Sequence, residues 1–226
     1  MGKKRRFSLV RLCVWLVGLW LGQLLLMRFI PVVLTPHLAA QRAKGHPVKQ
    51  DWVPLSEMSP ELTRAVIAAE DNRFCAHWGV DVVAMQQVFS EARAGKRLRG
   101  GSTISMQTTK NAYLWLSRSK VRKALEVALV PSVDLIWGKR RVMEVYLNLA
   151  EFGPGIYGVE AAAKHHFHTQ AAKLTRAQAA RLAAVLPSPK QWSASRPSRY
   201  IRRRARLIES RVADQGDLAD CVLKDG

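Results

Sequence analysis

The sequence predicts a mostly α-helical domain preceded by one membrane-spanning helix near the N-terminus. Two observations predict this class. Residues 12–34 form an almost uncharged apolar run, and about 20 apolar residues suffice to span a bilayer as a helix. After position 59, apolar residues recur at three- and four-residue spacing, whereas alternating strand-like runs are sparse. A length of 226 residues suits one domain plus an appendage, and an apolar content of 48% excludes a chain that is disordered in bulk.

The net charge of +19 indicates an anionic partner, which means nucleic acid, an acidic membrane surface or a phosphorylated substrate. The first 50 residues contain basic side chains but no acid, since Asp51 is the first carboxylate. This dense positive charge flanks the apolar run. A nucleic-acid binder does not explain that arrangement, and the body lacks the expected alternation of aromatic and basic residues.

Residues 1–11 are therefore interpreted as a basic cytoplasmic tail and residues 12–34 as a transmembrane anchor, with Arg28 reaching toward the interface. Basic residues lie on the N-terminal side, so we expect the remainder of the chain to be exported. A cleaved signal peptide is the main alternative, although the run is long and no small-residue cleavage site closes it. A buried core helix is the other.

Prolines and scattered charges over 35–58 suggest a linker and lead-in, and 59–226 is the expected domain. Ser59-Pro60 predicts a helix start. Further helices are expected from 121 to 137, divided or kinked by Pro131, and over 140–149, 158–167 and the segment after the capping-box pair Thr175 and Gln178. A basic helix (IRRRARLIES) is expected near the end of the domain. Cys75 and Cys221 could pair, but the sequence does not decide this.

Glu70 is a candidate catalytic carboxylate. It follows Val66 by four residues and Ile67 by three, so on a helix it lies beside the apolar stripe at the C-terminal end. Apolar surroundings and the negative end of the helix dipole both raise a carboxylate pKa, which suits proton transfer near neutral pH. The alternative is a solvated helix-end acid.

A polar loop and a cationic segment follow. The loop GGSTISMQTTKN at 100–111 supplies neutral donors and acceptors, and it lacks the spacing of a phosphate-binding P-loop. Cations then cluster around one carboxylate, Glu126, in numbers that a pyrophosphate would balance. The alternatives are an ordinary polar loop and a solvated basic face. The candidate substrate-binding residues are Ser102, Thr103, Gln107, Lys110, Asn111, Arg118, Arg122 and Lys123.

Five stretches occur in the order found in the glycosyltransferase domain of peptidoglycan polymerases, glycosyltransferase family 51. EDNRFCAHWG at 70–79 resembles the family's Glu-Asp-x-x-Phe-x-x-His-x-Gly, and the loop at 100–111 resembles its Gly-Gly-Ser-Thr-Ile segment. The remaining three family segments are similar to RKALE at 122–126, KRRVMEVYLN at 139–148 and GIYGVEAAAKHHF at 155–167. The chain ends where a two-function member would continue into a transpeptidase domain, so it resembles the monofunctional biosynthetic members.

The resemblance implies a lysozyme-like fold with a small membrane-proximal jaw. It implies transfer of the growing chain from undecaprenyl pyrophosphate onto the 4-hydroxyl of lipid II, with inversion. Glu70 corresponds to the general base and Glu126 to the second glutamate, while Lys110 and Arg118 match positions that engage the pyrophosphate. No cofactor is expected, apart from a divalent cation that could assist at the pyrophosphate.

Lipid II, the nascent strand and membrane lipid are the implied partners, and other cell-wall synthesis or division proteins are further candidates. We expect no nucleic-acid partner and a single-pass protein of the bacterial inner membrane. Met106 departs from the family pattern, since glutamine is usual there. Two alternatives are a peptidoglycan hydrolase or lytic enzyme, which would not need the cation set, and a non-catalytic anchored scaffold, against which the intact Glu70 and Glu126 argue.

Overall fold

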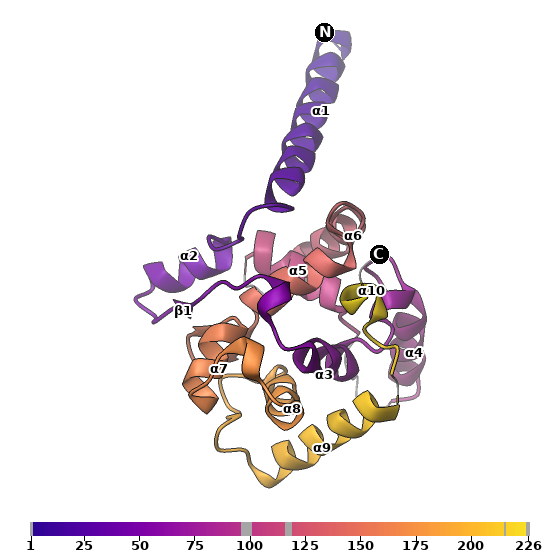
Figure 1. The fold of residues 1–226 in the computed structure, drawn as a ribbon. Coiled ribbons are helices and arrows are strands. Elements are labelled where there is room, and N and C mark those ends of the chain that lie inside the picture. The colour runs from indigo at the N-terminus through magenta and orange to yellow at the C-terminus, as the bar shows by residue number, and fades with distance from the viewer. Residues whose placement is uncertain (1, 96–100, 116–118, 215, 225–226) are drawn as a thin grey trace.

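The computed structural model describes residues 2–95, 101–115, 119–214 and 216–224. The first element, α1 (Gly2–Met27), projects from the body of the protein (Figure 1). Its window Val10–Met27 has a mean hydropathy of 1.8 and is long and apolar enough to cross a membrane. The helix ends at Met27, before the end of the 12–34 segment expected as the anchor. The chain after it packs partly against the body, where Val32 is buried.

The end of α1 is bonded to the body through the long helix α6 (Lys120–Leu149). The Trp20 indole donates a hydrogen bond of 3.0 Å to the Ser132 hydroxyl. Trp137 donates to the Leu24 carbonyl at 2.9 Å, and Arg141 donates to the Met27 carbonyl at 2.8 Å. Carbonyls near a helix C-terminus can lack intrahelical partners, and Arg141 supplies one to the Met27 carbonyl. The three bonds together fix the direction of α1 relative to the body.

The segment 35–58, expected as a linker and lead-in, contains regular structure. Thr35 caps α2 (Pro36–Ala43), and β1 (Lys49–Gln50) pairs in parallel with β3 (Ile156–Tyr157). β2 (Glu151–Gly153) completes a sheet of order β1-β3-β2. Few strands were expected, and these three are short. The pairing of β1 with β3 places residues 49–50 beside the 155–167 motif.

The expected helix at Pro60 is confirmed: α3 spans Pro60–Glu70, with Ser59 in the N-cap position. The Ser59 hydroxyl does not cap it, because it donates to the Leu174 carbonyl at 2.8 Å instead. Glu70 is the last residue of the helix, and Val66 and Ile67, one turn before it, are fully buried in the core. This arrangement positions a carboxylate at the edge of the hydrophobic core.

Pro131 does not divide α6, so the division expected there is wrong. The backbone stays helical through Pro131 and leaves helical geometry at Gly138, whose φ is +69°. Glycine adopts positive φ without the Cβ clash that other residues suffer. The two helices expected at 121–137 and 140–149 are therefore one element with a kink at Gly138. Both sides of the kink bond to α1, through Trp137 before it and Arg141 after it.

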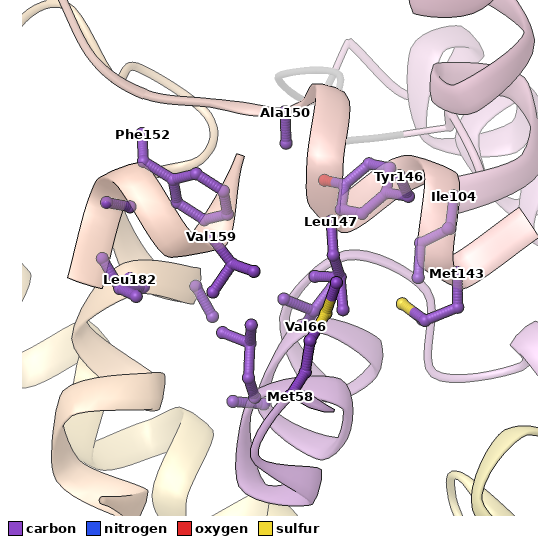
Figure 2. Close-up of a cluster of buried hydrophobic side chains, with 14 of the residues drawn as sticks. Met58, Val66, Ile104, Met143, Tyr146, Leu147, Ala150, Phe152, Val159 and Leu182 are labelled. Atoms are coloured by element: carbon purple, nitrogen blue, oxygen red, sulfur yellow. The ribbon is translucent and has the colours of Figure 1, made fainter. Parts of the chain in front are cut away.

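The core lies where the second half of α6 meets α3 and the C-terminal helices. Figure 2 shows Met58, Val66, Tyr146, Leu147 and Phe152 among its labelled side chains, all of which are buried. The remaining elements are η1 (Leu55–Glu57), η2 (Phe74–Ala76), α4 (Val82–Arg93), α5 (Ile104–Tyr113), α7 (Val159–Phe167), η3 (Ala171–Lys173), α8 (Arg176–Val185), α9 (Arg199–Asp214) and α10 (Asp220–Leu223). The capping box at Thr175 and Gln178 forms as expected.

A disulfide between Cys75 and Cys221 ties α10 to η2, with a Cα–Cα distance of 5.6 Å. That distance lies within the usual range for such bridges. It resolves the pairing that the sequence left open. Because η2 follows Glu70 by only a few residues, the bridge holds the C-terminal segment against the loop that leaves the candidate catalytic helix.

Candidate active site

Glu70 and Gln107 face each other across the junction of α3 and α5. The Gln107 side-chain amide donates a hydrogen bond of 3.0 Å to Glu70 Oε2. The Tyr146 hydroxyl donates to Gln107 Oε1 at 3.4 Å, and Tyr146 is 1% exposed. A chain of contacts therefore runs from the core through Gln107 to the carboxylate and sets its orientation.

Burial raises the pKa of Glu70 above its ordinary value. The hydrogen bond from Gln107 and the nearby Arg204 guanidinium lower the pKa and oppose this effect, while the neighbouring Asp71 carboxylate raises it further. Arg204 Nη2 lies 3.7 Å from Glu70 Oε1. The sequence prediction of a carboxylate in an apolar setting is thus matched by geometry. A carboxylate with a raised pKa is a stronger base once ionised than an exposed one.

Glu126 forms the second centre. Glu126 is 2% exposed. Its Oε1 lies 2.6 Å from Lys123 Nζ, and its Oε2 pairs with Arg122. Lys123 also donates to the Ser102 hydroxyl at 3.4 Å. These residues come from α6 and from the loop before α5, so the structure brings together four of the sequence-predicted site residues.

Lys110 lies on α5, one turn after Gln107. Burial lowers its pKa, Glu126 and Glu70 raise it, and Arg122 and Lys123 lower it. Both carboxylates and both α6 cations are therefore close enough to act on this ammonium. Among the residues that the structure describes, Lys110 has no hydrogen-bond or ion-pair partner. A half-buried cation without a fixed partner can bind an incoming anion without first breaking a bond.

The other predicted residues contribute differently. Thr103 is 4% exposed, and its hydroxyl donates to the Gly79 carbonyl and accepts from the Met106 amide, so it caps α5. Asn111 follows Lys110 on α5 without a described bond to the other site residues. Arg118 lies outside the described residues. Met106, where the family usually has glutamine, is 1% exposed and packs in the core, so thioether packing suits the position.

Asp71, His77 and Asp81 gather beside the site, with potential ligand atoms all within 4.8 Å of one another. The carboxylate oxygens of Asp71 and Asp81 already accept hydrogen bonds from other parts of the fold. Asp71 accepts from His77 Nε2 at 3.0 Å and from the Ile104 amide at 3.0 Å, and Asp81 accepts from the Ala84 amide at 2.9 Å. The trio thus anchors the starts of α4 and α5, and we assign it no metal.

A pocket of about 280 Å³ opens beside Glu70 between α3, α4 and α5. Ser102, Thr103 and Gln87 are among its lining residues, together with Arg211 of α9. Polar groups from elements far apart in sequence therefore converge on the carboxylate, as in a typical ligand site.

Sequence reasoning missed Arg204 as part of this site. It lies in the basic IRRRARLIES segment, where six arginines in one helix give no spacing signal that singles it out. Tyr146 lies within the recognised 139–148 stretch, but only the fold reveals its contact with Gln107.

Comparison with known proteins identifies the family of this chain. The family model described as "Transglycosylase" matches residues 37–213. A biosynthetic peptidoglycan transglycosylase of Caulobacter vibrioides is 46% identical over 200 residues, covering 88% of this chain and 87% of the relative. Namesakes from Agrobacterium fabrum (53% over 172 residues, 76% of each chain) and Pseudomonas entomophila (42% over 218 residues, 94% and 92%) are similar. The chain belongs to the transglycosylase family.

Proposed function

We propose that this protein is a peptidoglycan glycosyltransferase that polymerises glycan strands from lipid II. The observation that carries the proposal is the pairing of two unlike carboxylate sites. Glu70 is partly buried, which raises its pKa, whereas Glu126 is surrounded by cations. One site suits proton transfer and the other suits a pyrophosphate. The names of the relatives support the same reaction.

In the proposed reaction, ionised Glu70 accepts the proton of the acceptor's 4-hydroxyl as that oxygen attacks the donor's anomeric carbon. The bond from the anomeric carbon to the pyrophosphate oxygen breaks, and its electron pair leaves with undecaprenyl pyrophosphate. Attack opposite the leaving group inverts the anomeric centre. Lys110, Lys123, Arg122 and the predicted Arg118 stabilise the developing negative charge, while Glu126 holds two of these cations in place.

The cation set distinguishes this reaction from glycan hydrolysis. A hydrolase must protonate a sugar leaving group, and for that one carboxylic acid with a raised pKa suffices. It has no need of Lys110 and two further cations next to the second carboxylate. No observation in the described part of the structure therefore favours the hydrolase or the anchored scaffold over the glycosyltransferase.

We also propose that α1 anchors the protein in the bacterial inner membrane, with the N-terminus in the cytoplasm and the domain outside. Three features support this. The chain begins with a basic segment before the apolar helix. The disulfide between Cys75 and Cys221 suits an oxidising compartment. The exposed face of the first half of α6 carries Val121, Leu125 and Leu135, an apolar surface on the helix that contacts α1.

We propose that the reaction requires no cofactor. Lys110, Arg122 and Lys123 surround the carboxylate of Glu126, so the protein alone offers a divalent cation a poor site there. A divalent cation would depend on the oxygens of the pyrophosphate for its ligands, and no step of the proposed reaction needs it. Activity that persists in excess chelator supports this view.

The proposal is tested by giving the detergent-solubilised full-length chain labelled lipid II or finished peptidoglycan and resolving the products by gel. A ladder of long glycan from lipid II is the expected result. Release of fragments from finished peptidoglycan, without any ladder, would establish the hydrolase instead. Inactivity toward both substrates would favour the scaffold.

A further inference from the structure

We propose that the outward face of α9 is a binding site for carboxylate-bearing glycopeptide, the chemistry of the growing strand itself. This inference rests on the proposed function. α9 contains six arginines among sixteen residues, and its two acids, Glu209 and Asp214, come in its second half.

The arginines of the first half point away from the core. Ile201, Ala205, Ile208 and Val212 are the buried residues of α9. At 3.6 residues per turn, a second set of positions falls on the opposite side of the helix. That set, called here the arginine face, is Arg199, Arg202, Arg203 and Arg206, and all four are exposed.

The arginine face borders a hollow of about 640 Å³, whose lining consists of these four residues and Tyr200. The Tyr200 ring is 56% exposed and packs on Trp192 with a centroid distance of 5.5 Å. Guanidinium groups bind carboxylates in a bidentate manner, and an exposed aromatic ring offers an apolar surface beside them. Together these groups suit a ligand that combines carboxylates with less polar parts.

Nothing within the described chain neutralises the arginine face. None of its four members forms an ion pair there, and Arg202 donates only to the Pro197 carbonyl, at 2.6 Å. Like charges three and four residues apart on a helix repel one another. An anionic ligand would relieve this repulsion, so the face is better suited to binding than to stabilising the fold.

The position of α9 favours the strand over a lipid headgroup. α9 lies at the end of the molecule away from the free tip of α1 (Figure 1), so the arginine face is remote from the proposed bilayer. The same helix reaches the reacting centre, where Arg204 lies 3.7 Å from Glu70 and Arg211 lines the pocket beside it. A strand that leaves this centre carries one peptide stem with a free carboxylate on each repeat, and a row of arginines can bind successive stems.

The first test measures binding without lipid II, so it is independent of catalysis. The full-length protein is titrated with a soluble disaccharide-pentapeptide, with the same fragment after amidation of its carboxylates, and with polyglutamate. One variant changes the arginine face to glutamine at all four positions. The matched control changes four exposed cations elsewhere, Arg42→Gln, Lys44→Gln, Lys49→Gln and Lys173→Gln, and so removes equal charge.

We expect the wild type and the control to bind the fragment equally, and the arginine-face variant and the amidated ligand to show about tenfold weaker binding. We also expect mean strand length from lipid II to fall in the arginine-face variant and not in the control. Equal fragment binding by both variants would overturn the inference, as would binding of polyglutamate but not of the fragment, which would indicate an acidic protein partner. Failure of the wild type to make any strand would overturn the proposed function instead.

Discussion

The side-chain amide of Gln107 donates a 3.0 Å hydrogen bond to the carboxylate of Glu70, although 37 residues separate them. The buried Tyr146 hydroxyl holds the other end of the amide. The carboxylate is therefore both desolvated and oriented, and its pKa reflects a balance between burial and this bond.

Replacing Gln107 by alanine should shift the pH dependence of activity. The hydrogen bond lowers the Glu70 pKa, so its loss lets burial raise the pKa further. Because the base must be ionised, the acidic limb of the kcat/KM profile should move to higher pH. The control Gln191→Ala alters an exposed glutamine and should leave the profile unchanged. An unshifted profile for Gln107→Ala would show that this bond does not tune the base.

Glu70→Gln should abolish activity without lowering the thermal midpoint near neutral pH. A folded-state pKa above the unfolded value means that the stabilising contribution of Glu70 is complete below the unfolded pKa and is lost as pH rises through the folded pKa. At neutral pH a neutral glutamine avoids that loss, so the midpoint should stay the same or rise. Calorimetry at two pH values checks this, and a marked fall in midpoint would contradict it.

Glu126→Gln should behave differently, because Glu126 neutralises two cations. Removing its charge takes away the buried carboxylate that pairs with Arg122 and Lys123. We expect a loss of about 2 kcal/mol in the free energy of unfolding, measured by denaturant titration, together with lost activity. The exposed Glu57→Gln serves as the control. Stability equal to that of the control would mean that the cations are held by other contacts.

Cys75→Ser should lower the free energy of unfolding by about 2–4 kcal/mol under oxidising conditions, because the bridge to Cys221 closes a long loop. Cys13 is free and exposed, so Cys13→Ser should have no such effect. Adding a reductant should lower the free energy of unfolding of the wild type to that of Cys75→Ser. If the wild type and Cys75→Ser have the same free energy of unfolding without reductant, the bridge does not form.

Local signals in the sequence predicted the helices well. The Ser59-Pro60 pair and the capping box at Thr175 both mark real helix starts, because these signals act within a single turn. The break in α6 was misplaced at Pro131, since the helix continues through the proline and leaves helical geometry at Gly138, whose positive φ is easy for glycine. Within 35–58, α2 begins with a local signal that was not recognised, because Thr35 caps it and Pro36 is its first residue. The strand β1 depends on its pairing with β3, about 100 residues away, which local patterns do not encode.

The site was predictable to the extent that its residues lie in ordered motifs. Glu70, Gln107 and the cations around Glu126 were found from those motifs, and the fold brings them together. Arg204 was not found, because its contact with Glu70 arises from the packing of α9 against α3. The capping role of Thr103 was likewise hidden, since a loop threonine can bind either a ligand or its own backbone.

The most direct test of the central claim compares wild type and Glu70→Gln in one assay that follows both release of undecaprenyl pyrophosphate and growth of glycan from labelled lipid II. The account predicts that the wild type releases the pyrophosphate in step with strand growth, and that the folded variant still binds lipid II but does neither. A Glu70→Gln protein that polymerises at the wild-type rate would contradict the assignment of Glu70 as the base.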